Sequence, residues 1–143
     1  MKTLILYASV HHGNTKKIVD AIQKRINCDV IDATKYNNED LLSYEKIIVA
    51  SGVYFSSLHK SVDVILKSGI IKQNDVRLIL TSGSASKKYI TKISDLYKEY
   101  GVNFDSIFIC KGYDTYGPLK LIGGISKTHP DNNDIEEAIL SVQ

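Results

Sequence analysis

The chain has 143 residues, of which 43% are hydrophobic and 24% charged, with 18 basic and 16 acidic side chains and a net charge of +2. This balance argues against a nucleic-acid-binding surface, and no apolar stretch approaches the roughly 20 residues of a membrane helix. The first residues enter a strand-like run without a signal-peptide pattern. We therefore expect a single globular domain over residues 1–143, located in the cytoplasm.

The first predicted elements are a strand and a helix joined by a polar loop. Residues 4–7 are apolar without alternation, as in a strand covered on both faces, and apolar residues recur at helical spacing from Ile18 to Ile26. A helix start leaves about four backbone amides unpaired and carries roughly half a positive charge, so this loop can hold a phosphate group. The candidate residues for that group are Ser9, His11, His12, Gly13, Asn14 and Thr15.

The same loop has a simpler interpretation. Serine, asparagine and threonine before a helix commonly cap the helix start without any ligand. Other phosphate loops fit less well, because the chain lacks the Gly-x4-Gly-Lys-Ser/Thr run of nucleoside triphosphatases. It also lacks the Gly-x-Gly-x-x-Gly of dinucleotide-binding domains at this turn. The loop is thus predicted either to bind phosphate or only to cap the helix.

The rest of the chain alternates strand-like and helix-like segments. Strands are predicted at residues 28–33, 46–51, 76–81 and 104–110, and helices at about 58–68, 88–100 and 131–142. This alternation predicts a doubly wound, five-stranded, largely parallel α/β sheet with helices on both faces. Ligands of such sheets bind beyond the carboxyl ends of the strands, so the loops after strands one, three, four and five are candidates for a site.

The loops after strands three, four and five share a composition of glycine, small hydroxyl residues and aromatics. Glycine-rich turns place backbone amides against a ligand, and aromatic side chains give flat apolar walls, which together suit a phosphorylated aromatic cofactor. Each loop taken alone also fits a plain turn whose aromatics cover the core. The candidates in these loops are Gly52, Val53, Tyr54, Phe55, Ser82, Gly83, Ser84 and Tyr113.

The chain resembles the flavodoxin family over essentially its whole length. The segments that carry the resemblance are residues 5–9, 13–15, 112–119, 123–125 and 129–131, together with the order of the later loops. The resemblance implies a parallel sheet of order 2-1-3-4-5 that binds flavin mononucleotide (FMN). It further implies that the phosphate lies in the first loop and the isoalloxazine ring lies between the loops after strands three and four.

One departure from the family pattern lies in the first loop. Family members usually place the loop glycine three residues after the first serine or threonine, whereas Ser9 and Gly13 are four apart. His11 and His12 also stand where small hydroxylated residues are common. A protonated histidine beside a phosphate would have a raised pKa and would make cofactor affinity depend on pH. The alternative is that both histidines only face solvent.

No catalytic constellation accompanies these loops. His59 and His129 have no serine or cysteine nucleophile beside them in a recognisable motif, and metal-ligand spacing is absent. In the strand order that the resemblance implies, Cys28 and Cys110 lie at opposite edges, roughly 19 Å apart and too far for a disulfide. We therefore expect two buried free thiols, no metal site and no catalytic residue.

The resemblance implies a one-electron carrier that shuttles between a reductase and an acceptor protein. The balanced charge and the lack of a long apolar stretch argue against nucleic acid and membrane partners. The resemblance also makes Gly52 the candidate whose carbonyl would turn to hydrogen-bond the ring atom N5 on reduction. Low-potential flavodoxins are typically acidic, whereas Lys60, Lys87 and Lys88 flank the predicted site here. The alternative is a small FMN-dependent oxidoreductase acting on a quinone or a porphyrinogen-type substrate. A flavin-free binding module is a third, less well supported hypothesis.

Overall fold

The computed structural model describes the chain except for residues 1, 11, 72–73 and 115–120. Five parallel strands form its sheet in the order β2-β1-β3-β5-β6, which confirms the predicted order 2-1-3-4-5 with β5 and β6 as the fourth and fifth strands. A short strand, β4, pairs antiparallel with the end of β3. The bounds are β1 (Thr3–Ala8), β2 (Asp29–Asp32), β3 (Lys46–Tyr54), β4 (Ser57–Leu58), β5 (Asp75–Ser82) and β6 (Phe104–Lys111).

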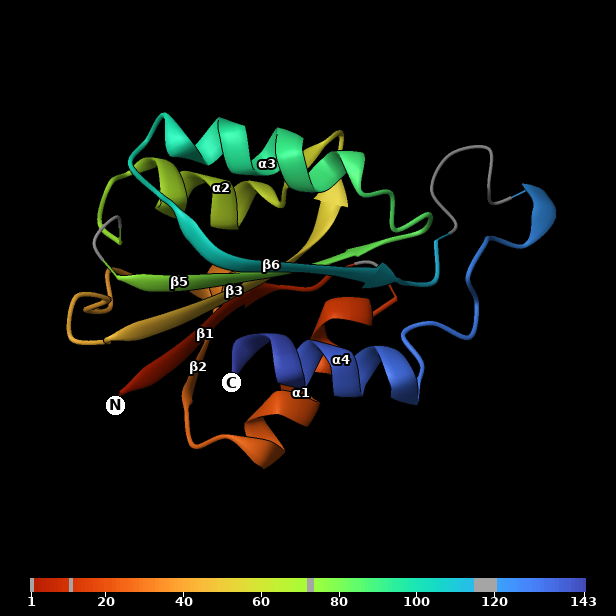
Figure 1. Cartoon of the computed structure of the whole chain (residues 1–143), viewed down its shortest axis with the longest axis horizontal. Coiled ribbons are helices and arrows are strands. Elements are labelled where there is room, and N and C mark those ends of the chain that lie inside the picture. Colours follow the sequence, from red (N-terminus) through yellow and green to blue (C-terminus); the bar gives the residue numbers. More distant parts are fainter. Residues whose placement is uncertain (1, 11, 72–73, 115–120) are drawn as a thin grey trace.

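The helices cover both faces of the sheet (Figure 1). On one face lie α1 (Asn14–Arg25) and α4 (Asn132–Val142), and on the other α2 (Lys60–Lys67) and α3 (Lys88–Lys98), while a short 3-10 turn, η1 (Ala33–Lys35), follows β2. Because each helix returns the chain between parallel strands, α1, α2 and α3 begin at the edge where the strands end. Across the described ranges, no helix is both long enough and apolar enough to cross a membrane.

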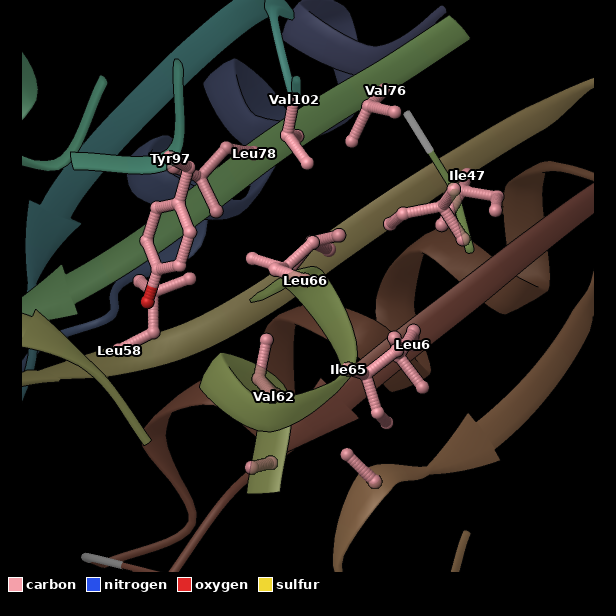
Figure 2. Packing of buried hydrophobic residues seen from close by; sticks show 14 of the residues in the cluster. Leu6, Ile47, Leu58, Val62, Ile65, Leu66, Val76, Leu78, Tyr97 and Val102 are labelled. Carbon is pink, nitrogen blue, oxygen red and sulfur yellow. The ribbon is translucent and has the colours of Figure 1, made fainter. Parts of the chain in front are cut away.

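Two hydrophobic cores lie on the two sides of the sheet. Leu6 and Val49 pack toward α2 and α3, whereas their neighbours Ile5 and Ile48 pack toward α1 and α4. Figure 2 shows the first core, where Tyr97 of α3 and the side chains of α2 meet the strands. Because both faces of β1 and β3 are buried, these strands are apolar at successive positions, which is the feature that the sequence displays.

The third strand is longer than predicted. The expected strand ended at Ser51 and placed Gly52, Val53 and Tyr54 in a loop, but β3 continues to Tyr54. The prediction was wrong here because Val53 and Tyr54, which favour extended backbone, pair with β4 as Val53–Leu58 and Tyr54–Ser57. The following helix consequently begins at Lys60 rather than near residue 58.

The two cysteines are free thiols in different surroundings. Cys110 of β6 is buried, whereas Cys28, which precedes β2, is only partly buried. The expectation of two buried thiols is therefore correct for Cys110 alone. Burial, together with the nearby carboxylates of α4, raises the pKa of the Cys110 thiol to about 12. Because the thiolate is the reactive form, Cys110 is a packing residue.

Candidate functional site

A cleft of about 380 Å³ opens at the edge of the sheet where the strands end. Its volume falls in the range of about 300 to 1,000 Å³ that is usual for small-molecule sites. The loop before α1, the β3–β4 turn and the segments after β5 and β6 surround it. The lining residues are Ser9, Val10, Asn14, Thr15, Gly52, Val53, Tyr54, Phe55, Thr81, Ser82, Gly83, Ser84, Tyr89, Tyr113, Asp114 and Ile125.

The start of α1 forms one end of the cleft. Gly13 is the N-cap residue and has a φ of 66°, the left-handed conformation that glycine adopts without strain. Ser9 Oγ accepts a hydrogen bond of 2.9 Å from the amide of Lys16, and the first helical bond runs from the Lys17 amide to the Gly13 carbonyl. The amides of Asn14 and Thr15 precede that bond, at the positive end of the helix dipole. This end of the cleft suits an anionic group.

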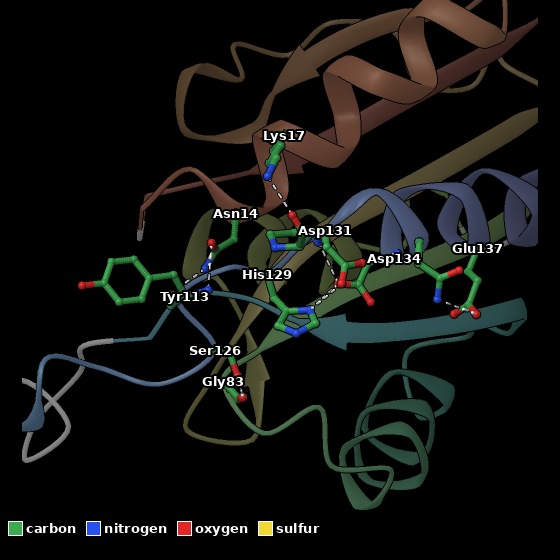
Figure 3. A network of polar contacts seen from close by, with 11 residues as sticks. Asn14, Lys17, Gly83, Tyr113, Ser126, His129, Asp131, Asp134 and Glu137 are labelled. Carbon is green, nitrogen blue, oxygen red and sulfur yellow. Dashed lines mark hydrogen bonds and ion pairs between the residues drawn. The ribbon is translucent and has the colours of Figure 1, made fainter.

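The side chains of Asn14 and Thr15 hold α1 against the ends of the neighbouring strands. Asn14 Nδ2 donates to the Tyr113 carbonyl at 2.8 Å, and Asn14 Oδ1 accepts from the Tyr113 amide at 3.1 Å (Figure 3). The hydroxyl oxygens of Thr15 and Thr81 are 3.1 Å apart and buried. A Cβ at Gly112 would lie 2.6 Å from Asn14 Nδ2, so glycine is needed there. Both side chains have protein partners, so a phosphate at this end would have to be bound by backbone amides.

The β3–β4 turn forms an aromatic rim. Phe55 and Ser56 have φ values of 50° and 64°, as in the tight hairpin turns that usually contain asparagine and glycine. Phe55 lines the cleft although 86% of its surface is exposed. The ring of Tyr54 packs over Gly52, where a Cβ would lie 3.1 Å from it. Burial, followed by the nearby Asp114 carboxylate, raises the pKa of the Tyr54 hydroxyl.

Gly52 does not lie in a loop, contrary to the expectation from the sequence. It is part of β3, where it pairs with Thr81 of β5, and its carbonyl accepts a hydrogen bond of 2.8 Å from Ser51 Oγ. Turning this peptide would disturb that bond and the adjoining strand pairing. The turning carbonyl predicted for Gly52 therefore does not fit the geometry, and the turn residues after β3 are Phe55 and Ser56.

The segment after β6 folds over Gly83 and closes one side of the cleft. Asp114 and Ile125 pair through two backbone hydrogen bonds of 3.0 and 2.8 Å, and Ser126 Oγ donates to the Gly83 carbonyl at 2.7 Å. A Cβ at Gly83 would lie 2.6 Å from Asp114 Oδ2 and 2.9 Å from Ile125 Cδ1. Only glycine at position 83 lets these segments of the chain approach so closely.

A polar network connects this segment to α1 and α4 (Figure 3). The Tyr113 amide also donates to the His129 carbonyl at 3.0 Å, and Lys17 Nζ donates to the Pro130 carbonyl at 2.7 Å. His129 Nδ1 lies 2.6 Å from Asp134 Oδ2. The start of α1, the segment after β6 and the start of α4 therefore form one connected unit.

Three potential metal-binding side chains of this network meet at the start of α4. Ligand atoms of His129, Asp131 and Asp134 lie within 4.8 Å of one another, a grouping that the sequence did not indicate. Asp131 and Asp134 make both hydrogen bonds of a capping box, and the amide of Asp134 is the main reason that the pKa of Asp131 is lowered. We assign these side chains to capping α4.

The structure brings most of the predicted site residues together. The predicted residues that line the cleft are Ser9, Asn14, Thr15, Gly52, Val53, Tyr54, Phe55, Ser82, Gly83, Ser84 and Tyr113, with Gly13 capping α1 beside them. The exposed ring of His12 stacks on Tyr113, with centroids 4.1 Å apart. His11 and the part of the family-like segment at residues 115–119 lie outside the described residues. Binding of a cofactor by any of these residues stays a prediction.

Five lining residues were missed from the sequence: Val10, Thr81, Tyr89, Asp114 and Ile125. Thr81 could have been predicted as a site residue, because it ends a predicted strand at the edge where ligands bind. Tyr89, in the first turn of α3, faces the same edge and was also recoverable. Asp114 and Ile125 meet only through their bridge across the segment after β6, which no local pattern indicates.

Comparisons with known proteins agree with this fold. The family model of the flavodoxin domain matches residues 4–112. An uncharacterized protein of Methanocaldococcus jannaschii is 37% identical over 141 residues, covering 96% of this chain and 93% of that protein. The chain therefore belongs to the flavodoxin family.

Two solved structures show the same fold at low sequence identity. Oxidised Flavodoxin 1 from Bacillus cereus has a TM-score of 0.67 at 17% identity, covering 98% of this chain and 93% of its own. A flavoprotein from Lactobacillus acidophilus, solved in complex with FMN, has a TM-score of 0.59 at 20% identity and covers 76% of this chain and 92% of its own.

Proposed function

We propose that this protein binds FMN in the cleft and carries electrons between redox proteins. The observation that supports this most is that one cleft joins the amide-bearing start of α1 to aromatic side chains of three other segments. A phosphate suits the first part and a planar ring system the second. The FMN complex of the Lactobacillus acidophilus flavoprotein, which shares the fold, adds support.

The residues present fit this cofactor. Gly83 and Gly112 have no side chain where a Cβ would collide with Asp114 or Asn14, so the walls of the cleft approach closely. When bound, FMN supplies the electron-accepting ring chemistry, and the chain orients the ring and sets its surroundings. Tyr54, Phe55 and Tyr89 offer apolar cover that keeps water from a ring. The Asp114 carboxylate opposes a gain of negative charge in the cleft and so favours a low reduction potential.

We also propose that this carrier is located in the cytoplasm, because its free thiols fit that compartment. Cys28 and Cys110 are both unpaired. Free cysteines are expected in a reducing compartment, where disulfides are rare.

Titration of the apoprotein with FMN, followed by flavin fluorescence, tests cofactor binding. We expect FMN to bind tightly, with quenching of its fluorescence. Riboflavin should bind at least tenfold more weakly, because it lacks the phosphate that the α1 amides would hold. Equal affinities for FMN and riboflavin would contradict the assignment of the α1 end, and absence of binding by either flavin would overturn the proposed function.

A second candidate function is a small FMN-dependent oxidoreductase acting on a quinone or a porphyrinogen-type substrate. The observation that favours it is the exposed lysines at the starts of α2 and α3, which would attract the carboxylates of a porphyrinogen. An anaerobic, stepwise reductive titration of the FMN-loaded protein separates the two functions. Two resolved one-electron steps support the carrier. A single two-electron step, with rapid turnover of a small acceptor, supports the oxidoreductase.

A further inference from the structure

The face of the molecule beside the aromatic rim is positively charged. Lys60 is the first residue of α2, Lys87 is the N-cap of α3 and Lys88 is its first residue, and all three side chains are exposed. We call these three residues the lysine face. Residues 46–62 and 76–94 contain no aspartate or glutamate, so no carboxylate within these two segments offsets the positive charge.

The lysine face adjoins the cleft. Tyr89, next to Lys88, lines the cleft, and the ring of His59, next to Lys60, meets the cleft residue Tyr54 edge-on with centroids 5.5 Å apart. Figure 1 shows the beginning of α3 and the arrowhead of β6 at the same edge of the sheet. Phe55, the most exposed apolar side chain of the cleft, lies on the same rim.

The charges of the lysine face are not used inside the fold. Within the described ranges, none of the three lysines has an ion-pair partner. The nearest acidic residue in α2, Asp63, accepts a hydrogen bond of 2.6 Å from the Tyr97 hydroxyl and pairs with Lys67 at 3.3 Å. The Asp63 carboxylate therefore already has partners in α3 and in the next turn of α2.

Lysines at these positions oppose the stability of the helices. The N-terminus of a helix carries partial positive charge and favours acidic side chains. The first turn of α3 has no acidic residue and no side-chain cap, but begins with two lysines. Positive charge is thus concentrated where the fold gains nothing from it, next to the edge at which a cofactor would be exposed.

On the other face of the sheet, acidic side chains are paired with basic ones. Asp20 of α1 pairs with Lys16 at 3.0 Å, and Glu136 of α4 pairs with Arg25 of α1 at 2.5 Å. The cleft itself holds the Asp114 carboxylate, so the three lysines, which have no ion pair within the described ranges, lie outside the cleft, on the side of α2 and α3. A partner of opposite charge would be steered to that side.

We infer that the lysine face, with Phe55 at its border, docks an acidic surface of the electron-transfer protein that exchanges electrons with this one. This inference rests on the proposed function, because it assigns a partner to the same site. Exposed positive charge would accelerate encounter, and the apolar ring of Phe55 would be covered on contact.

Surface plasmon resonance of apo and FMN-loaded protein tests the inference, because association is then measured independently of flavin binding. The probes are a plant-type ferredoxin, as a small acidic redox protein, and cytochrome c, as a basic one. We expect ferredoxin to associate faster than cytochrome c, with an association rate that falls as salt is raised. The variant K87E/K88E should associate with ferredoxin about tenfold more slowly at low salt, and the difference should disappear at high salt.

The control variant K24E/K98E makes the same change in net charge in the last turns of α1 and α3, at the ends of these helices that lie away from the cleft. It should associate with ferredoxin within about twofold of the unchanged protein, because it lies away from the rim. Thermal melting tests whether K87E/K88E is folded, and we expect its Tm to equal or exceed that of the unchanged protein.

Two results would overturn the inference. One is equal ferredoxin association by K87E/K88E and the unchanged protein, and the other is a preference for cytochrome c. Failure of FMN binding with salt-dependent ferredoxin docking retained would instead overturn only the proposed cofactor.

Discussion

The side-chain amide of Asn14 forms hydrogen bonds to both backbone groups of Tyr113, a residue 99 positions further along the chain. The Nδ2 donor reaches the Tyr113 carbonyl at 2.8 Å, and the Oδ1 acceptor receives the Tyr113 amide at 3.1 Å. This pair connects the first residue of α1 to the segment that follows β6. The end of the cleft that suits an anion and the aromatic side of the cleft are thereby held in one fixed geometry.

Replacing Asn14 tests that connection. Asn14→Asp keeps the acceptor for the Tyr113 amide, loses the donor to its carbonyl and adds a negative charge beside the α1 amides. We expect the free energy of unfolding to fall by about 0.5 to 1.5 kcal/mol, the usual contribution of one hydrogen bond. We expect FMN affinity to fall about tenfold or more through repulsion of the phosphate. Urea denaturation and flavin fluorescence measure the two effects.

Asn14→Ala and Asn103→Asp are the matched controls for that charge. Asn14→Ala loses both hydrogen bonds without adding charge, so its FMN affinity should exceed that of Asn14→Asp. Asn103→Asp adds the same charge at an exposed position before β6, at the opposite edge of the sheet, and should leave FMN affinity unchanged. An equal loss of FMN affinity in Asn14→Asp and Asn14→Ala would show that phosphate does not lie near Asn14.

Gly83→Ala tests the close packing under the segment after β6. An added Cβ would lie 2.6 Å from Asp114 Oδ2, so Asp114 and Ile125 would have to move away. We expect unfolding free energy to drop by about 1 to 3 kcal/mol, as for other overpacked sites, and FMN binding to weaken. The neighbouring exposed change Ser84→Ala should alter stability by less than about 0.5 kcal/mol. A Gly83→Ala protein as stable as Ser84→Ala would contradict the observed packing.

The acid sensitivity of the fold should depend in part on Asp131. Hydrogen bonding by the Asp134 amide lowers the pKa of Asp131 below its ordinary value of 3.8. Because the folded-state pKa is the lower one, this carboxylate stabilises the folded chain above about pH 4. That contribution is lost as the pH falls through the folded-state value.

Asp131→Asn tests this pH dependence, because asparagine caps helices about as well as aspartate and does not titrate. We expect the unfolding free energy of the variant to decline less steeply than that of the unchanged protein below pH 4, as followed by urea denaturation at a series of pH values. Asp95→Asn, an exposed change within α3, serves as the control. Identical acid profiles for Asp131→Asn and the unchanged protein would contradict the capping role.

The strands and helices could be predicted because their signals are local, whereas the strand order came from the resemblance to the flavodoxin family. Successive apolar residues at positions 4–7 indicated a buried parallel strand. The Gly13-Asn14-Thr15 run indicated a helix start at the edge of the sheet where the strands end. The site was only partly predictable. The bridge between Asp114 and Ile125 depends on how a long segment folds back, and no periodicity in the sequence encodes that return.

The β3–β4 turn was missed for a different reason. Tight hairpin turns with two positive φ values usually contain asparagine and glycine, but here Phe55 and Ser56 occupy those positions. Bulky or branched residues in this conformation are held there by the surrounding pairing, at an energetic cost that is common beside functional sites. The turn therefore follows from the pairing of β3 with β4 and not from its own residues.

Ser56→Gly should stabilise the protein by relieving that cost. Ser56 has a φ of 64°, where an L-residue is strained and glycine is not. Subtracting the extra flexibility of glycine in the unfolded chain, we expect unfolding free energy to rise by about 0.5 to 1 kcal/mol. The adjacent change Ser57→Gly gives the opposite expectation, because Ser57 is extended in β4 and glycine weakens a strand by about 0.5 to 1 kcal/mol. Thermal and urea denaturation of the two variants measure the difference. A stability order with Ser57→Gly above Ser56→Gly would show that the left-handed turn is not the conformation of this chain in solution.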